Sequence, residues 1–218
     1  DSPWIDWKNL PEGYREKIKR LCIDRGLFSG DGRTGGINLN VCALIAHVCL
    51  TNWLKETGKL AFLMPKELAV QQSYQGWRRF QGEPSHSILS FTDWTDAGHP
   101  FDPVKEDFMT YIIGSKHNHS VIPSTTYIKK PRTGTKARSW KNIQEAEENL
   151  VKSDGYAGQI IPNSTAFTFS HSEEDLKRFS LIAGEAAYIG REGIEFYPQE
   201  LLLFRFDRKG PRPNTVFL

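Results

Sequence analysis

The chain opens with an acid, a proline and an aromatic residue in close succession: Asp1, Ser2, Pro3 and Trp4. A carboxylate such as that of Asp1 accepts hydrogen bonds and stabilises positive charge that develops beside it. The ring of Trp4 offers a flat face on which an aromatic ligand could stack. A structural alternative stays open, in which the chain leaves a strand at a turn and both Trp4 and Trp7 pack on the core.

A second candidate for function is a basic stretch in the middle of the chain. No Asp or Glu occurs between residues 117 and 141, and the cationic residues singled out there are Lys129, Lys130, Arg132, Lys136 and Arg138. Clustered lysine and arginine side chains neutralise DNA phosphates, so this stretch is a candidate for DNA contact. Pro131 and Gly134 equally fit a solvated flexible linker, and both interpretations stay open.

Composition indicates an ordinary globular protein. Of the 218 residues, 39% are hydrophobic and 25% are charged, which is typical of this class. No apolar run approaches the roughly 20 residues that a membrane-spanning helix needs, so no membrane partner is expected. The three cysteines, Cys22, Cys42 and Cys49, form no C-x-x-C pair. We therefore expect buried free thiols in a cytoplasmic protein, and no metal site.

Apolar patterning predicts alternating helices and strands in the first half of the chain. A largely buried helix is predicted over residues 38–56, then a short strand over 59–65 that is apolar enough to be buried on both faces. A helix over 67–80 and strands over 87–93 and 107–114 follow. This order predicts an α/β fold, one half of a doubly wound sheet that ends in a hairpin.

The remaining segments are more polar and predict a smaller α+β region. A charged helix is expected from residue 12 to about 22, near the start of the chain. Further helices are expected over 140–152 and from a capping box at Ser172 to about Gly184. A strand is expected over 201–206.

Several of these segments together resemble DNA methyltransferases that act on exocyclic amino groups, in particular adenine-N6 enzymes of restriction–modification type. Residues 1–4 resemble the catalytic motif of that family, with Ser2 where proline is usual. Residues 58–65, Gly-Lys-Leu-Ala-Phe-Leu-Met-Pro, resemble the strand region that follows the motif. Residues 78–80, Arg-Arg-Phe, resemble the end of the next helix. The resemblance covers roughly residues 1–116.

The resemblance implies the second half of a Rossmann-like methyltransferase sheet, followed by the smaller α+β region. It divides the chain into three parts. Residues 1–116 would be the C-terminal half of the catalytic domain. Residues 117–142 would be a basic linker or DNA-contacting segment, and residues 143–218 would begin the target-recognition region.

The resemblance also implies a reaction, in which a methyl group passes from S-adenosylmethionine to N6 of an adenine flipped out of double-stranded DNA. The catalytic residues would be Asp1, Ser2, Pro3 and Trp4. The Asp1 carboxylate and the Ser2 backbone carbonyl would accept hydrogen bonds from the amine. Trp4 would stack on the base, with Phe101 on its other face.

The family's Gly-rich cofactor loop precedes the catalytic motif, and this sequence starts at the motif. We therefore expect a fragment with an incomplete S-adenosylmethionine pocket, inactive alone, whose partners are double-stranded DNA and a missing N-terminal half. Two alternatives stay open: a non-catalytic DNA-binding or specificity module, and an unrelated α/β interaction domain.

Overall fold

The computed structural model describes residues 2–28, 39–80, 86–98, 106–115, 120–130 and 142–183, together with 205–206 and 216–217. The chain forms two compact units, Asp1–Gly184 and Glu185–Leu218. In the smaller unit, strands β7 (Arg205–Phe206) and β8 (Val216–Phe217) pair antiparallel. The predicted strand over 201–206 is described only at its last two residues.

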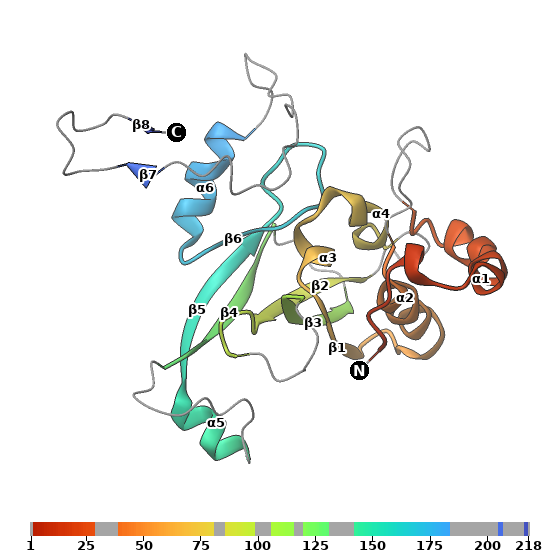
Figure 1. Ribbon diagram of the computed structural model, residues 1–218, viewed down its shortest axis with the longest axis horizontal. Coiled ribbons are helices and arrows are strands. Elements are labelled where there is room, and N and C mark those ends of the chain that lie inside the picture. The colour runs from red at the N-terminus through yellow and green to blue at the C-terminus, as the bar shows by residue number, and fades with distance from the viewer. Residues whose placement is uncertain are drawn as a thin grey trace. The chain divides into compact units, whose positions relative to one another are not determined.

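The larger unit contains a six-stranded sheet with the order β1-β3-β2-β4-β5-β6 (Figure 1). Its strands are β1 (Lys59–Pro65), β2 (His86–Asp93), β3 (Phe108–Ser115), β4 (Val121–Lys129), β5 (Leu150–Gly158) and β6 (Thr168–Ser170). β3 pairs antiparallel with both β1 and β2, and β2 pairs parallel with β4. β1, β2 and β4 therefore run in one direction. The predicted α/β class, the three strands of the first half and their final hairpin are confirmed.

Helices at the start of the unit largely match their predictions. The first elements are η1 (Trp7–Asn9), α1 (Glu12–Asp24) and α2 (Val41–Trp53). Asn40 caps α2, because its side-chain oxygen accepts a hydrogen bond from the N–H of Cys42 at 3.2 Å. Such a cap satisfies one of the amide groups that a helix leaves without a partner at its first turn. The apolar run that follows explains why α2 is mostly buried.

The predicted continuous helix over residues 67–80 is wrong, because the structure breaks it into α3 (Glu67–Val70), η2 (Gln72–Tyr74) and α4 (Gln75–Arg78). The break lies at Gln71, whose backbone is extended. Its carbonyl accepts a hydrogen bond from Arg78 Nη2 at 2.8 Å. Arg78 also donates to the carbonyls of Leu68 and Thr165. The buried guanidinium thus holds the Leu68 and Gln71 carbonyls, which a continuous helix would have bonded internally.

Aromatic side chains from the helices and the sheet form the centre of the core. Trp77 of α4 meets Tyr111 of β3 edge-on, with ring centroids 5.6 Å apart, and Tyr111 meets Phe91 of β2 in the same way at 5.2 Å. All three side chains are almost fully buried. Edge-to-face contacts of this kind add stabilisation beyond the burial of apolar area.

The prediction that β1 is buried on both faces is wrong. Lys59 and Ala61 are exposed, and only Met64 and Pro65 of this strand are buried. The physical reason is position, since β1 is the edge strand of the described sheet and pairs with β3 alone. Leu60 and Phe62 still pack partly against the core, so the apolar pattern reflects one covered face.

Beyond residue 116 the sheet continues. Residues 117–142, interpreted as a linker or DNA-contacting segment, include β4, which pairs with β5 over its whole length. α5 (Ile143–Asn149) is shorter than the predicted helix over 140–152, because β5 begins at Leu150. β4 and β5 form a long two-stranded ribbon with α5 at one end (Figure 1). The division of the chain at residues 116 and 142 stays a prediction.

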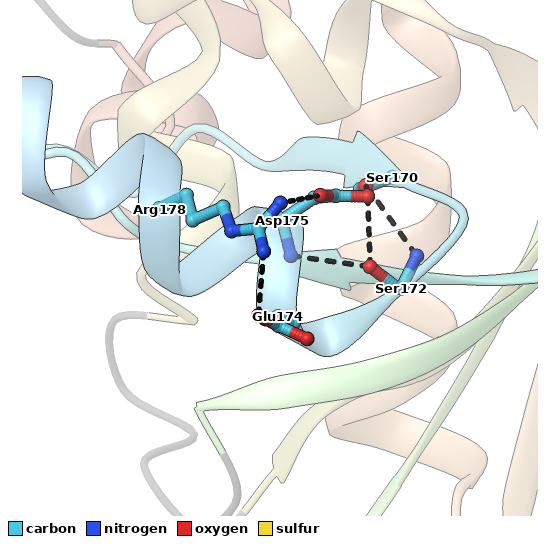
Figure 2. A network of polar contacts seen from close by, with 5 residues as sticks. All are labelled: Ser170, Ser172, Glu174, Asp175 and Arg178. Carbon is cyan, nitrogen blue, oxygen red and sulfur yellow. Dashed lines mark hydrogen bonds and ion pairs between the residues drawn. The ribbon is translucent and has the colours of Figure 1, made fainter.

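Helix α6 (Glu173–Ile182) begins at the predicted cap, Ser172. The Ser172 N–H donates to the Ser170 hydroxyl at 3.5 Å and not to Asp175, so the described bonds form an N-cap without the reciprocal bond of a capping box. The Ser172 hydroxyl accepts a hydrogen bond from the N–H of Asp175 at 3.1 Å and lies 2.7 Å from its carboxylate (Figure 2). Arg178 pairs with Glu174 one turn away. Across the described residues, no helix is both long and apolar enough to cross a membrane.

Candidate functional site

The carboxyl ends of the parallel strands β1, β2 and β4 meet at one edge of the sheet, together with the amino end of the antiparallel β3. We call this end of the strands the carboxyl edge, as distinct from the lateral edge formed by β1. It comprises residues 63–66, 93–95, 108 and 127–130. In open α/β sheets, ligands bind preferentially outside the carboxyl ends of the parallel strands. Three of the sequence candidates lie at this edge.

Trp4 is the first of them. Its indole Nε1 donates a hydrogen bond to the carbonyl oxygen of Leu63 at 3.1 Å, two residues before β1 ends. Its ring lies beside that of Phe108, with centroids 5.7 Å apart and planes tilted by 37°. Trp4 remains half-buried. The motif is therefore fixed at the carboxyl edge through a ring whose surface is only partly covered.

The backbone after Trp4 is anchored to the start of α2. The N–H of Val41 donates to the Ile5 carbonyl at 2.9 Å, and the N–H of Trp7 donates to the Leu39 carbonyl at 2.7 Å. This short ladder resembles strand pairing. It fixes the direction in which the chain leaves the motif, so residues 2–4 are held by the fold.

Within the motif, Pro3 is exposed and Ser2 is 7% exposed. Among the described residues, the Ser2 hydroxyl has no hydrogen-bond partner. Buried hydroxyl groups are normally hydrogen-bonded, so the Ser2 hydroxyl is an exception among the described residues. The first motif residue, Asp1, lies outside the described residues.

Four further candidates also lie outside the described residues: Phe101, Arg132, Lys136 and Arg138. The aromatic that the structure places beside Trp4 is Phe108, which the sequence did not single out. A signal for it existed, because Phe108 is the second residue of the strand predicted over 107–114. In a hairpin, that position returns to the edge where the preceding strand ends.

Sequence analysis missed an ion pair at the carboxyl edge. It joins the end of β1 to the end of β2, on either side of β3. Lys66 Nζ lies 2.7 Å from the Asp93 carboxylate, and Thr95 donates to the same carboxylate through its N–H and hydroxyl, at 3.0 and 2.6 Å. Burial raises the pKa of the Asp93 carboxyl, but the hydrogen bonds from Lys66 and Thr95 outweigh it and leave the pKa below its usual value. Asp93 is therefore a stably charged group.

Lys129 and Lys130, at the end of β4, also lie at the carboxyl edge. The N–H of Lys129 donates to the Asp96 carbonyl at 2.8 Å. Lys130 Nζ donates to the Glu148 carbonyl at 2.7 Å, close to the end of α5. The structure thus brings both lysines to the same edge as Trp4. Their role in DNA binding stays a prediction.

The methyl donor of the predicted reaction requires a pocket of its own. The segments after β1 and β2 carry Lys66–Glu67 and Trp94–Gly98, and neither resembles a Gly-rich cofactor loop. The incomplete S-adenosylmethionine pocket of this chain stays a prediction. The described residues hold no group of three His, Cys, Asp or Glu side chains placed to bind a metal.

Comparisons with known proteins point to a solved structure but to no family and no curated protein. No family model and no curated protein matches the sequence. Among solved structures, the type IIG restriction endonuclease BpuSI is similar over 57% of this chain and 14% of its own, with a TM-score of 0.38 and 16% identity. This chain thus corresponds to a small part of that protein's length.

Proposed function

We propose that this chain holds the target base in a site-specific DNA methyltransferase that modifies adenine N6. The observation that carries the proposal is the place of the motif. Trp4 lies at the carboxyl end of β1, beside Phe108, with part of its ring surface exposed. A residue that stacks on a base needs a fixed ring with an accessible face, and the carboxyl edge is where an α/β sheet offers it.

The order of elements supports the same proposal. After the motif come the helices α1 and α2, a strand, a helical segment, a second parallel strand and an antiparallel strand inserted between the two. The resemblance to amino-group methyltransferases leads us to expect a helix, a strand, a helix, a strand and a final hairpin in that order. We propose that β1, β3 and β2 are the second half of a Rossmann-like sheet.

In this proposal the chemistry belongs to residues 1–4. The Asp1 carboxylate and the Ser2 carbonyl accept hydrogen bonds from the adenine amine, which localises the nitrogen lone pair and stabilises the positive charge that develops on it. Trp4 stacks on the base, which contributes about 1–3 kcal/mol and offsets part of the cost of unstacking. S-adenosylmethionine would supply the methyl group from a pocket that we expect this chain to form only in part.

The experiment is a pair of substitutions in the full-length protein. Asp1→Ala should lower kcat strongly and leave the affinity for DNA nearly unchanged, because its carboxylate acts on charge that appears in the transition state. Trp4→Ala should weaken binding of the flipped base. Trp53→Ala is the matched control, since this exposed indole ends α2, which leads to the amino end of β1. Equal loss of DNA affinity and turnover in Asp1→Ala would make Asp1 a structural residue.

A non-catalytic DNA-binding module is the second candidate function. The position of Lys129 and Lys130 at the carboxyl edge fits such a module as well as it fits the methyltransferase. Each phosphate contact contributes about 0.9 to the slope of log affinity against log salt. The double variant Lys129→Glu, Lys130→Glu should therefore reduce the slope by nearly two units. Lys55→Glu with Lys59→Glu, exposed residues at the amino end of β1, is the control. DNA binding with this slope and without methylation would select the module over the enzyme.

A further inference from the structure

A second pair of aromatic rings lies at the carboxyl edge, away from Trp4. Trp94 follows β2 and Tyr127 lies near the end of β4. Their rings stack face to face, with centroids 4.7 Å apart and planes 5° from parallel. Both side chains are half-buried, and neither belongs to the core cluster nor packs against it. Part of this double ring therefore faces outward.

The pair is held in place by the sheet. β2 and β4 pair in parallel up to Asp93 and Thr126, so the next residue on each strand is Trp94 or Tyr127. The indole Nε1 of Trp94 donates to the Thr110 hydroxyl at 2.9 Å, and its backbone N–H donates to the Phe108 carbonyl at 3.2 Å. A flat partner that stacks on these rings would find them already oriented, which reduces the entropy lost on binding.

The charges around the rings suit a nucleic-acid strand. Lys129 lies two residues after Tyr127, on the same face of β4. Across the ribbon, Tyr127 is opposite Lys152, whose charge is met by Asp154 at 3.0 Å. A half-exposed aromatic stack next to a lysine on a sheet edge matches the combination by which proteins bind unpaired bases, a stacking face beside a cation for the phosphate.

The rings cannot hold the same base as Trp4. Trp4 is bonded to β1 and Trp94 follows β2, which are separated by β3. Two strand spacings amount to about 10 Å. A single flat base cannot lie against rings this far apart, so the second ring pair would hold a different base from the one at Trp4.

We propose that Trp94 and Tyr127 form a platform on which a second, unpaired DNA base stacks beside the one held at Trp4. This platform rests on the proposed function only in its ligand, DNA; it requires neither the methyl donor nor methyl transfer. The platform holds the strand next to the target base in an open conformation, and Lys129 contacts the adjacent phosphate.

The test measures how the protein binds two labelled 12-nucleotide strands of equal charge by fluorescence anisotropy. One strand is oligodeoxyadenosine, and the other has abasic sites at its inner positions. The unmodified protein should bind the strand with bases about 5- to 150-fold more tightly for each stacked base. Tyr127→Val and Trp94→Leu should each lower this ratio at least about fivefold and leave the affinity for the abasic strand unchanged.

Two controls keep the test decisive. Tyr127→Phe retains the ring and should preserve the ratio, and Tyr127→Val keeps a residue that strands favour. Trp53→Ala removes an exposed indole from the end of α2 and should change nothing. A ratio that survives Tyr127→Val and Trp94→Leu but falls in Trp4→Ala would overturn the platform and leave the proposed function in place. Equal weakening of both strands, or no preference for bases in the unmodified protein, would also overturn it.

Discussion

Two regions of the larger unit are stabilised in different ways. The core half consists of β1, β3 and β2 with α2, α3 and α4, and its central side chains, such as Trp77 and Tyr111, are no more than 1% exposed. The ribbon consists of β4 and β5 with α5. There the directly opposed pair Ile128 and Val151 is 41% and 46% exposed. The core half depends on burial. The ribbon shares that core at the paired residues Ile122 and Ala157, whereas its outer part, toward α5, depends on backbone pairing and surface contacts.

This difference assigns a different role to each region: the core half supports the proposed base site, and the ribbon presents cationic side chains. The core half fixes Trp4 and Phe108 through buried packing, so the proposed base site has a rigid support. The outer part of the ribbon presents Lys129 and Lys130 from a segment with few buried apolar side chains, whereas Tyr127 is held by its stack on Trp94. Regions with few buried apolar contacts open locally at low cost. The two lysines can therefore adapt to a bound partner while the aromatic rings keep their geometry.

The largest test of the comparison is truncation of one apolar side chain in each region. Trp77→Ala should lower the free energy of unfolding by about 3–5 kcal/mol, because it opens a cavity against Tyr111 and Phe80. Val151→Ala, in the ribbon, should cost less than about 1 kcal/mol, since its side chain is already half in solvent. Urea titration of both variants measures the difference. Similar losses of unfolding free energy in both variants would contradict the idea that the outer ribbon is stabilised mainly by backbone pairing.

A second test concerns the buried guanidinium of the core half. Arg78→Lys keeps the charge but cannot reach the carbonyls of Leu68, Gln71 and Thr165 together. Each carbonyl left without a donor costs about 1–3 kcal/mol, so a total loss of about 2–4 kcal/mol is expected. Burial lowers the pKa of Arg78 to about 10, so the group stays charged at neutral pH. Its exposed neighbour Arg79 provides the control: Arg79→Lys should leave stability unchanged.

A third test uses pH to compare two carboxylates. The pKa of Asp93 is lowered in the folded protein, so its contribution to stability is complete above the unfolded value of about 3.9 and is lost as the pH falls through the lower folded value. Asp93→Asn should therefore cost about 1–3 kcal/mol at pH 7, and the gap to the unmodified protein should close below about pH 4. Unfolding in urea at pH 7, 5 and 3 measures this gap.

The ribbon supplies the matched acid. Asp154 pairs with Lys152 and has a lowered pKa through the hydrogen bonds from Lys152 and Thr125, but its side chain is 70% exposed. Solvent and salt screen such a pair. Asp154→Asn should leave the unfolding midpoint unchanged at every pH. A loss as large as that of Asp93→Asn would show that surface pairing stabilises the ribbon more than its exposure implies.

The sequence predicted the parts of the fold that local signals specify. The apolar runs of α2, β1, β2 and β3 and the cap at Ser172 carry their own pattern, and each was found close to its expected position. β4 and β5 were missed because neither strand alternates apolar and polar residues and each depends on the other. Nothing in residues 121–129 indicates partners 21 to 37 residues later, as the pairing of Lys129 with Leu150 and of Val121 with Gly158 requires.

The candidate site shows the same limit. The motif at residues 2–4 was found through resemblance, and the structure places Trp4 at an edge suited to binding. Phe108 and the Lys66–Asp93 pair were missed, since they reach this edge only when the hairpin folds. The break at Gln71 has a similar cause, because the guanidinium that holds its carbonyl also bonds Thr165, 87 residues away from Arg78. Side chains that act across strands leave no periodic signal.

The smallest expected effects concern two serines, whose replacement by alanine should change the free energy of unfolding in different directions. Ser172→Ala removes the cap of α6 and should lower stability by about 1 kcal/mol. Ser2→Ala removes a buried hydroxyl that has no partner among the described residues, so stability should stay unchanged or rise by up to about 1 kcal/mol. Under the proposed function, methylation should also survive Ser2→Ala, because the proposed contact comes from the backbone carbonyl. A loss of stability in Ser2→Ala would reveal a partner for the hydroxyl, whereas a loss of turnover at unchanged stability would assign the hydroxyl itself to the reaction.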